Sequence, residues 1–146
     1  MLDDVRGMSN YAYHIKEYTG KGYLCVGDSH RFMDPIFSFG LHFALAEAAK
    51  AGDAISMYLK GETADLENPF TKYQETCERG QDVIMALLDA FWDYPLAFSL
   101  YLKDKKYWGD FIDMFAGRVY AENPYDGLLA LLELNKGELG VSKNFA

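Results

Sequence analysis

The chain has 146 residues, half of them hydrophobic and 25% charged, and its 22 Asp and Glu outnumber its 14 Lys and Arg by eight. This length predicts one domain with a substantial core, and the composition excludes a disordered or collagen-like chain. The acidic balance, without a basic stripe, argues against nucleic-acid binding. The longest apolar segment, residues 41–59, is interrupted by Glu47, Lys50 and Asp53, so no membrane span is predicted. Because the N-terminus also lacks a secretory signal, we expect a soluble cytoplasmic protein.

Neither cysteines nor histidines indicate a metal site. Cys25 and Cys77 are too few for a disulfide scaffold and have no zinc-ligand spacing, so we expect small buried thiols. His14, His30 and His42 do not share the spacing of metal ligands either. The sequence therefore predicts no metal.

The first elements predicted are a strand and a loop. Residues 23–26, Tyr-Leu-Cys-Val, form an apolar run bounded by glycines, which predicts a short, fully buried strand within a strand or hairpin region over residues 1–27. The closely spaced Asp, Ser and Pro that follow predict a loop over residues 28–40. Because an isolated hairpin is marginal in water, this strand suggests a missing neighbour.

A long helix is predicted after the loop, ending near Gly61, by apolar and small residues that recur every three or four positions. This predicted face comprises Leu41, Leu45, Ala48, Gly52, Ile55 and Leu59.

A second helix is predicted to open at Asn68-Pro69, with Asn68 as its cap, and to kink or end at Pro95. Its face is predicted by the same spacing, in Phe70, Tyr73, Cys77, Gly80, Ile84, Leu87 and Phe91.

Two shorter helices are predicted over residues 107–115 and 125–134, the latter opened by Asn123-Pro124. The fold class is therefore α+β, mostly α: a strand or hairpin near the N-terminus, a loop and about four helices. We expect a single domain over residues 1–135, with the helical part at 41–135 and a loose tail at 136–146.

A candidate ligand site follows the predicted strand. Asp28, at the strand end, offers an acceptor for ligand hydroxyl groups. Backbone N–H groups around Phe39, Gly40 and Leu41 begin the long helix, where unpaired donors and the helix dipole favour an anion. A glycine at position 40 also lets the backbone approach a ligand closely.

This stretch resembles the second flavin-binding motif of FAD-dependent monooxygenases, in which a strand and Gly-Asp are followed by a Pro seven and a Gly twelve residues after the Asp. Gly27-Asp28, Pro35 and Gly40 occupy these positions. Residues 34–42, Asp-Pro-Ile-Phe-Ser-Phe-Gly-Leu-His, resemble the flavin-dependent halogenase-like branch most closely. That resemblance implies the C-terminal portion of a Rossmann-type FAD- or NAD(P)-binding enzyme.

The resemblance also implies roles for individual residues. Asp28 would bind the ribityl hydroxyls of FAD, and the loop Pro35–Gly40 would lie over the isoalloxazine and pyrophosphate side. Backbone amides near Phe39 and Gly40 would lie where halogenases hold a halide. The cofactor-binding residues expected are Gly27, Asp28, Pro35, Ser38, Phe39, Gly40 and Leu41, whereas no catalytic residue or substrate is assigned.

The sequence departs from the family in several ways. Phe39 replaces the usual Ser or Thr, and His30-Arg31 replaces a pair of small residues. No Gly-x-Gly-x-x-Gly motif is present, so the ADP-binding half of an FAD site is missing. We therefore expect an oxidoreductase fragment that is inactive alone, does not retain FAD alone, and has as its partner the N-terminal half or a second copy.

Some alternatives stay open. The whole chain is alternatively a non-catalytic helical interaction or dimerisation module derived from such an enzyme. His30 is either a solvent-facing loop residue or a contact at the flavin edge. We expect Asp34 to cap the turn before Pro35 and His42 to serve in packing or capping.

Overall fold

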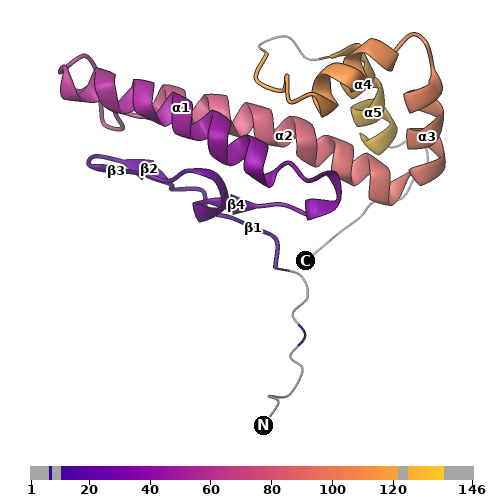
Figure 1. Cartoon of the computed structure of the whole chain (residues 1–146), viewed down its shortest axis with the longest axis horizontal. Coiled ribbons are helices and arrows are strands. Elements are labelled where there is room, and N and C mark those ends of the chain that lie inside the picture. The colour runs from indigo at the N-terminus through magenta and orange to yellow at the C-terminus, as the bar shows by residue number, and fades with distance from the viewer. Residues whose placement is uncertain (1–6, 8–10, 122–124, 137–146) are drawn as a thin grey trace. The chain divides into compact units, whose positions relative to one another are not determined.

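The computed structural model describes residue 7, residues 11–121 and residues 125–136 (Figure 1). The described residues are mostly helical, with short strands near the N-terminus, as predicted. The chain divides into two compact units, Met1–Gln74 and Glu75–Ala146. The first unit contains the predicted flavin-site loop.

Among the described residues of the first unit, four two-residue strands form two antiparallel pairs. Strand β1 (Tyr13–His14) pairs with β4 (Arg31–Phe32), and β2 (Thr19–Gly20) pairs with β3 (Tyr23–Leu24). Gly22, with φ 87°, lies in the turn between β2 and β3, where a side chain would be strained. These strands form two separate ladders, so both have open edges.

The prediction of a fully buried strand over residues 23–26 is wrong. The strand ends at Leu24, and Tyr23 is 50% exposed. A two-stranded antiparallel ladder leaves one face in water, whereas the apolar run was interpreted as a strand covered on both faces. The backbone at Cys25 is hydrogen-bonded outside the strand: its N–H donates to the Tyr18 carbonyl (2.9 Å), and its carbonyl accepts from the Tyr73 hydroxyl (2.8 Å).

Helix α1 (Gly40–Leu59) has the extent predicted, and Gly61, with φ 84°, follows its end. The face expected to pack, however, is largely exposed: Leu41 is 72% and Leu45 66% exposed. The buried residues of α1 are instead Phe43, Glu47 and Ala51. Apolar periodicity predicts the helix correctly, but α1 has two faces with apolar residues, and the spacing alone does not determine which one is covered.

Helix α2 (Thr71–Asp93) begins after the predicted cap. The Asn68 side-chain oxygen accepts from the Phe70 N–H (3.0 Å), and the Asn68 carbonyl accepts from the Thr71 hydroxyl (2.9 Å). The predicted face is buried from its first residue to Leu87, and only Phe91 is half-buried. The boundary between the two units falls in the first turn of this helix, after Gln74.

Pro95 ends α2 and begins a helix that was not predicted, α3 (Pro95–Lys103). Its apolar residues lie on more than one face: Leu96 and Leu100 are 83% and 71% exposed, whereas Phe98 is buried. No single helix among the described residues is long and apolar enough to cross a membrane. Within the described part of the chain, one helix pair, α2 and α3, has that length and composition when taken together, and it is bent by 118°.

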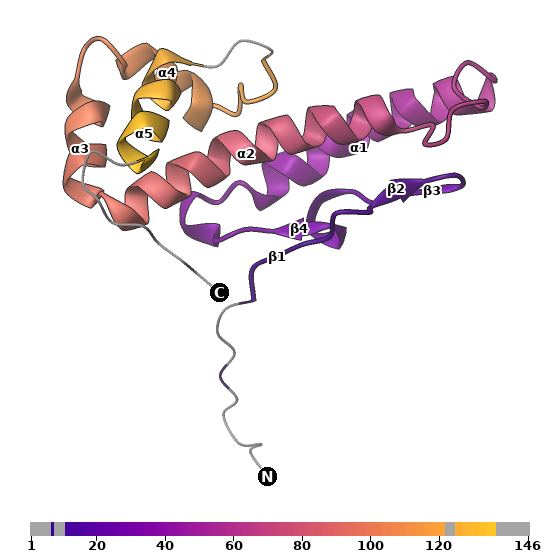
Figure 2. The same cartoon turned by 180° about the vertical axis from the view of Figure 1, so that it is seen from behind.

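The second unit also contains α4 (Trp108–Phe115) and α5 (Asp126–Lys136), close to the predicted ranges. Helix α4 contacts both α3 and α5 (Figure 2). The rings of Phe98 and Phe111 lie 6.2 Å apart, and the Gly127 N–H donates to Asp110 (2.8 Å). The predicted helix opening at Asn123-Pro124 and nearly all of the predicted tail, residues 137–146, lie outside the described residues.

Candidate functional site

The predicted Gly-Asp pair lies in a tight turn packed against α1. This turn is the 3-10 helix η1 (Gly27–Ser29). Gly27 has φ 58°, and a Cβ at this position would lie 3.1 Å from the Ala44 Cβ and 3.2 Å from its Cα. Both the left-handed backbone and the close approach to α1 therefore require glycine. The Ser29 hydroxyl closes the turn onto Val26 at 2.8 Å.

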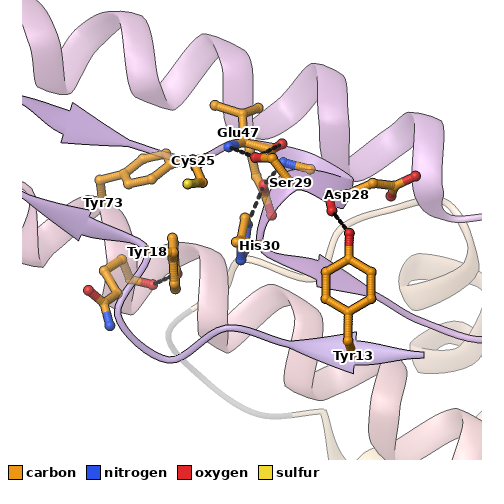
Figure 3. A network of polar contacts seen from close by, with 11 residues as sticks. Tyr13, Tyr18, Cys25, Asp28, Ser29, His30, Glu47 and Tyr73 are labelled. Atoms are coloured by element: carbon orange, nitrogen blue, oxygen red, sulfur yellow. Dashed lines mark hydrogen bonds and ion pairs between the residues drawn. The ribbon is translucent and has the colours of Figure 1, made fainter. Parts of the chain in front are cut away.

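A buried polar network anchors this turn (Figure 3). Glu47 Oε2 accepts from the Gly27 N–H at 2.6 Å and lies 3.0 Å from His30 Nε2. The side chains of Glu47 and His30 are both 0% exposed. The ring of Tyr18 stacks on that of His30 at 3.9 Å with an interplanar angle of 10°. One carboxylate on α1 thus holds both ends of the turn.

Both sequence interpretations of His30 are wrong, because the residue is fully buried rather than solvent-facing or at a ligand edge. The role of Glu47 was missed altogether. Its position was available as a signal, since a carboxylate in the middle of an apolar helix needs a polar partner when it is buried.

Asp28 lies between the anchored residues and is itself exposed. Its side chain points away from the Glu47–His30 pair, while its backbone carbonyl accepts from the Tyr13 hydroxyl (Figure 3). A Cβ at Gly40 would lie 3.8 Å from Asp28 Oδ1, so the carboxylate lies beside the first residue of α1. Within residues 11–121 and 125–136, no lysine or arginine pairs with this carboxylate.

The N-terminus of α1 carries amide donors without a side-chain cap. Phe39, the capping residue, makes no side-chain cap hydrogen bond, and its carbonyl accepts from the Phe43 N–H at 3.0 Å. The N–H groups of Gly40 and Leu41 precede this first helical bond and therefore have no acceptor within the helix. Both residues are exposed. The structure thus brings a carboxylate and a helix N-terminus together at one corner of the first unit.

The segment between Asp28 and Gly40 contains a second 3-10 helix, η2 (Pro35–Phe37). Asp34 caps it, as predicted, by accepting from the Ile36 N–H at 3.0 Å. Ser38 then adopts a left-handed conformation, with φ 57° and ψ 33°. Phe39 is buried, whereas Pro35 and Ser38 are exposed.

Other chemistry is not indicated by the described residues. Among them, no three His, Cys, Asp or Glu side chains are grouped so that they could hold a metal ion. Cys25 and Cys77 are free thiols, half-buried and buried respectively.

Comparison with known proteins identifies relatives of the chain. No family model matches it. It is 35% identical over 116 residues to the 1H-pyrrole-2-carbonyl-[peptidyl-carrier protein] brominase of Pseudoalteromonas luteoviolacea, a match that covers 80% of this chain and 28% of the brominase. It is 29% identical over 114 residues to the corresponding chlorinase of Pseudomonas fluorescens, covering 77% of this chain and 25% of the chlorinase. A flavin-dependent halogenase of Armillaria mellea is 38% identical over 63 residues.

A solved structure supports the same relationship. The flavin-dependent brominase Bmp2 aligns with a TM-score of 0.79 and 29% identity, over 86% of this chain and 31% of that one. The chain is therefore related to the flavin-dependent halogenases, as the motif predicted. It spans about a quarter to a third of the length of these relatives.

Proposed function

We propose that this chain supplies the ribityl and isoalloxazine side of the FAD site in a halogenase-like oxidoreductase. Asp28 accepts hydrogen bonds from the ribityl hydroxyls, and the N–H groups of Gly40 and Leu41 face the electronegative edge of the flavin ring. The observation that carries the proposal is the position of the Asp28 carboxylate beside Gly40, at the uncapped N-terminus of α1.

The residues present fit such a cofactor. A Cβ at Gly40 would meet only Asp28 Oδ1 within 4 Å, so the backbone at that position is open to close approach. Acceptor and donors are both exposed, and the dipole of α1 favours negative charge at this end. Bound FAD would supply redox chemistry with oxygen, while the chain would orient the ring and hold it by hydrogen bonds.

The motif further supports a halide subsite at the amides near Phe39 and Gly40, which are backbone groups and do not need the missing Ser or Thr. Binding of the ADP part of FAD needs residues that this sequence does not supply, because it has no Gly-x-Gly-x-x-Gly motif. We therefore propose that the chain alone binds FAD weakly and does not turn over substrate.

The test is a hybrid in which this chain replaces the matching segment of the Pseudoalteromonas brominase. The folded hybrid is expected to purify with bound FAD and its yellow spectrum, and to lose most of the flavin on Asp28→Ala. Asp53→Ala, at an exposed carboxylate on the same helix α1, serves as the control and retains the flavin. Equal flavin content in both variants contradicts the role of Asp28. A bromide-dependent change in the flavin spectrum tests the halide subsite separately.

The extent of the matches supports a proposal for the substrate class. The brominase and the chlorinase match 80% and 77% of this chain, and both act on a pyrrolyl group tethered to a carrier protein. The tryptophan 2-halogenase of Chondromyces crocatus matches 59%. We propose a carrier-tethered aromatic acyl group as substrate. The hybrid should brominate pyrrolyl-carrier protein and leave free tryptophan unchanged, and the reverse preference contradicts this proposal.

An interaction module is the second candidate function. The outward face of α1 carries Leu41, Leu45 and Leu59, each at least 66% exposed, which is unusual for a face that stays in water. Size-exclusion chromatography with light scattering distinguishes the candidates. A stable, flavin-free dimer that becomes monomeric on Leu45→Glu supports the interaction module. A chain that stays monomeric at all concentrations contradicts it.

A further inference from the structure

The turn that carries Asp28 is held at both ends by a single atom. Glu47 Oε2 accepts from the Gly27 N–H at 2.6 Å on one side of Asp28 and lies 3.0 Å from His30 Nε2 on the other (Figure 3). The His30 N–H also donates to the Gly27 carbonyl at 3.1 Å. Because the side chains of Glu47 and His30 are completely buried, water does not replace these contacts.

The carboxylate of Asp28 itself is not anchored in this way. It is exposed and lies beside Gly40. The backbone carbonyl of Asp28 accepts from the Tyr13 hydroxyl. The direction of the Asp28 Cα–Cβ bond is therefore set by its peptide units, which the buried network holds in place.

Helix α1 carries both reference points. Gly40 is its first residue and Glu47 lies seven residues later, which is about two turns along the same rigid helix. Because Glu47 contacts both Gly27 and His30, the turn that carries Asp28 keeps a fixed position along α1 relative to the N–H donors at the start of this helix. A small shift of the turn would move the carboxylate out of register with these donors.

We infer that Glu47 is a positioning residue for flavin binding, which acts through Asp28 on recognition of the ribityl hydroxyls. The inference rests on the proposed function of Asp28. It predicts that Glu47 strengthens the binding of flavins that carry a ribityl chain and leaves unchanged the binding of flavins that carry only the ring.

The experiment titrates the full chain, labelled with ¹⁵N, with two flavins by NMR. One is FMN, and the other is an isoalloxazine whose ribityl chain is replaced by a carboxymethyl group. Glu47→Gln is expected to move the Gly27 amide resonance and to raise the Kd for FMN about fivefold, the size of one lost hydrogen bond. The Kd for the carboxymethyl flavin stays unchanged. When Asp28→Asn is already present, adding Glu47→Gln is expected to weaken FMN binding no further.

The alternative outcomes separate the two proposals. If Glu47→Gln weakens both flavins equally, or adds fully to Asp28→Asn, Glu47 has only a general structural role and the inference is overturned. If Asp28→Asn itself leaves FMN binding unchanged, the proposed function of Asp28 fails first.

A second variant covers the case in which Glu47→Gln does not fold. Tyr13→Phe removes the hydroxyl that holds the Asp28 carbonyl, at a side chain that is 46% exposed. Tyr11→Phe, at a neighbouring tyrosine that is 48% exposed, is the matched control. Selective weakening of FMN binding by Tyr13→Phe alone supports positioning through the Asp28 backbone, and equal binding by the two variants contradicts it.

Discussion

Glu47 accepts a hydrogen bond from the Gly27 amide at 2.6 Å across the interface between α1 and η1. The contact joins residues twenty positions apart and is fully buried. It therefore ties the turn that presents Asp28 to the helix that presents the N–H donors of the candidate flavin site.

Removing the Glu47 carboxylate should destabilise the chain strongly. Glu47→Ala leaves the buried Gly27 N–H without its acceptor, takes from His30 its contact with Oε2, and opens a cavity. We expect the free energy of unfolding to fall by about 2–4 kcal/mol. Glu62→Ala, at an exposed glutamate, should change it by less than about 0.5 kcal/mol. Urea unfolding followed by circular dichroism measures both, and equal small effects would show that the network contributes little.

Alanine substitutions at two glycines with left-handed backbones, Gly22 and Gly27, distinguish the cost of backbone strain from the cost of tight packing. Gly22→Ala meets no atom within 4 Å, so it adds only backbone strain of about 1 kcal/mol. Gly27→Ala adds the same strain and also forces a Cβ against Ala44, for a total loss of about 2–4 kcal/mol. Comparison of the two urea midpoints gives the difference. A Gly27→Ala variant as stable as Gly22→Ala would mean that η1 does not pack closely on α1.

Substitution at Gly40 should affect ligand binding more than stability. The new Cβ makes only an ordinary contact, 3.8 Å from Asp28 Oδ1, so we expect unfolding to change by less than about 0.5 kcal/mol. The methyl group nevertheless occupies the corner proposed for the flavin, and FMN binding should weaken. Gly52→Ala, in the exposed middle of α1, is the control and should stabilise by about 1 kcal/mol without changing FMN binding. Indistinguishable FMN affinities would exclude Gly40 from the site.

The two faces of α1 should respond differently to truncation. Phe43 is 3% exposed, and Phe43→Ala is expected to cost about 3–5 kcal/mol. Leu45 is 66% exposed, and Leu45→Ala should cost less than about 1 kcal/mol in the monomer. Thermal unfolding at low protein concentration measures the loss of stability in both variants. A larger loss at Leu45 than at Phe43 would mean that the face predicted from apolar spacing is the one that packs.

Local signals predicted much of the helical fold. The caps at Asn68 and Asp34 and the break at Pro95 depend on residues close in sequence, and all three were confirmed. The buried face of α1 was not predictable in the same way, because it depends on contact with η1, which is distant in sequence. Helix α3 was missed because its apolar residues lie on more than one side, with Leu96 and Leu100 exposed and Phe98 buried, so that no single apolar face marks the helix.

The candidate site shows the same division. The motif spacing between Asp28 and Gly40 predicted that the two lie together, and in the structure the Asp28 carboxylate lies beside Gly40. The spacing did not predict the buried residues that hold the Asp28 turn against α1. Glu47 and His30 are joined only in three dimensions, so their pairing could be recognised only from the fold.

The central claim is that Asp28 and the N-terminus of α1 form one flavin subsite, and titration of the ¹⁵N-labelled chain with FMN tests it most directly. We expect saturable shifts of the Asp28, Gly40 and Leu41 amides with a Kd on the order of 1 mM, which Asp28→Asn weakens. An absence of shifts at these amides, or shifts that Asp28→Asn leaves unchanged, would contradict the claim.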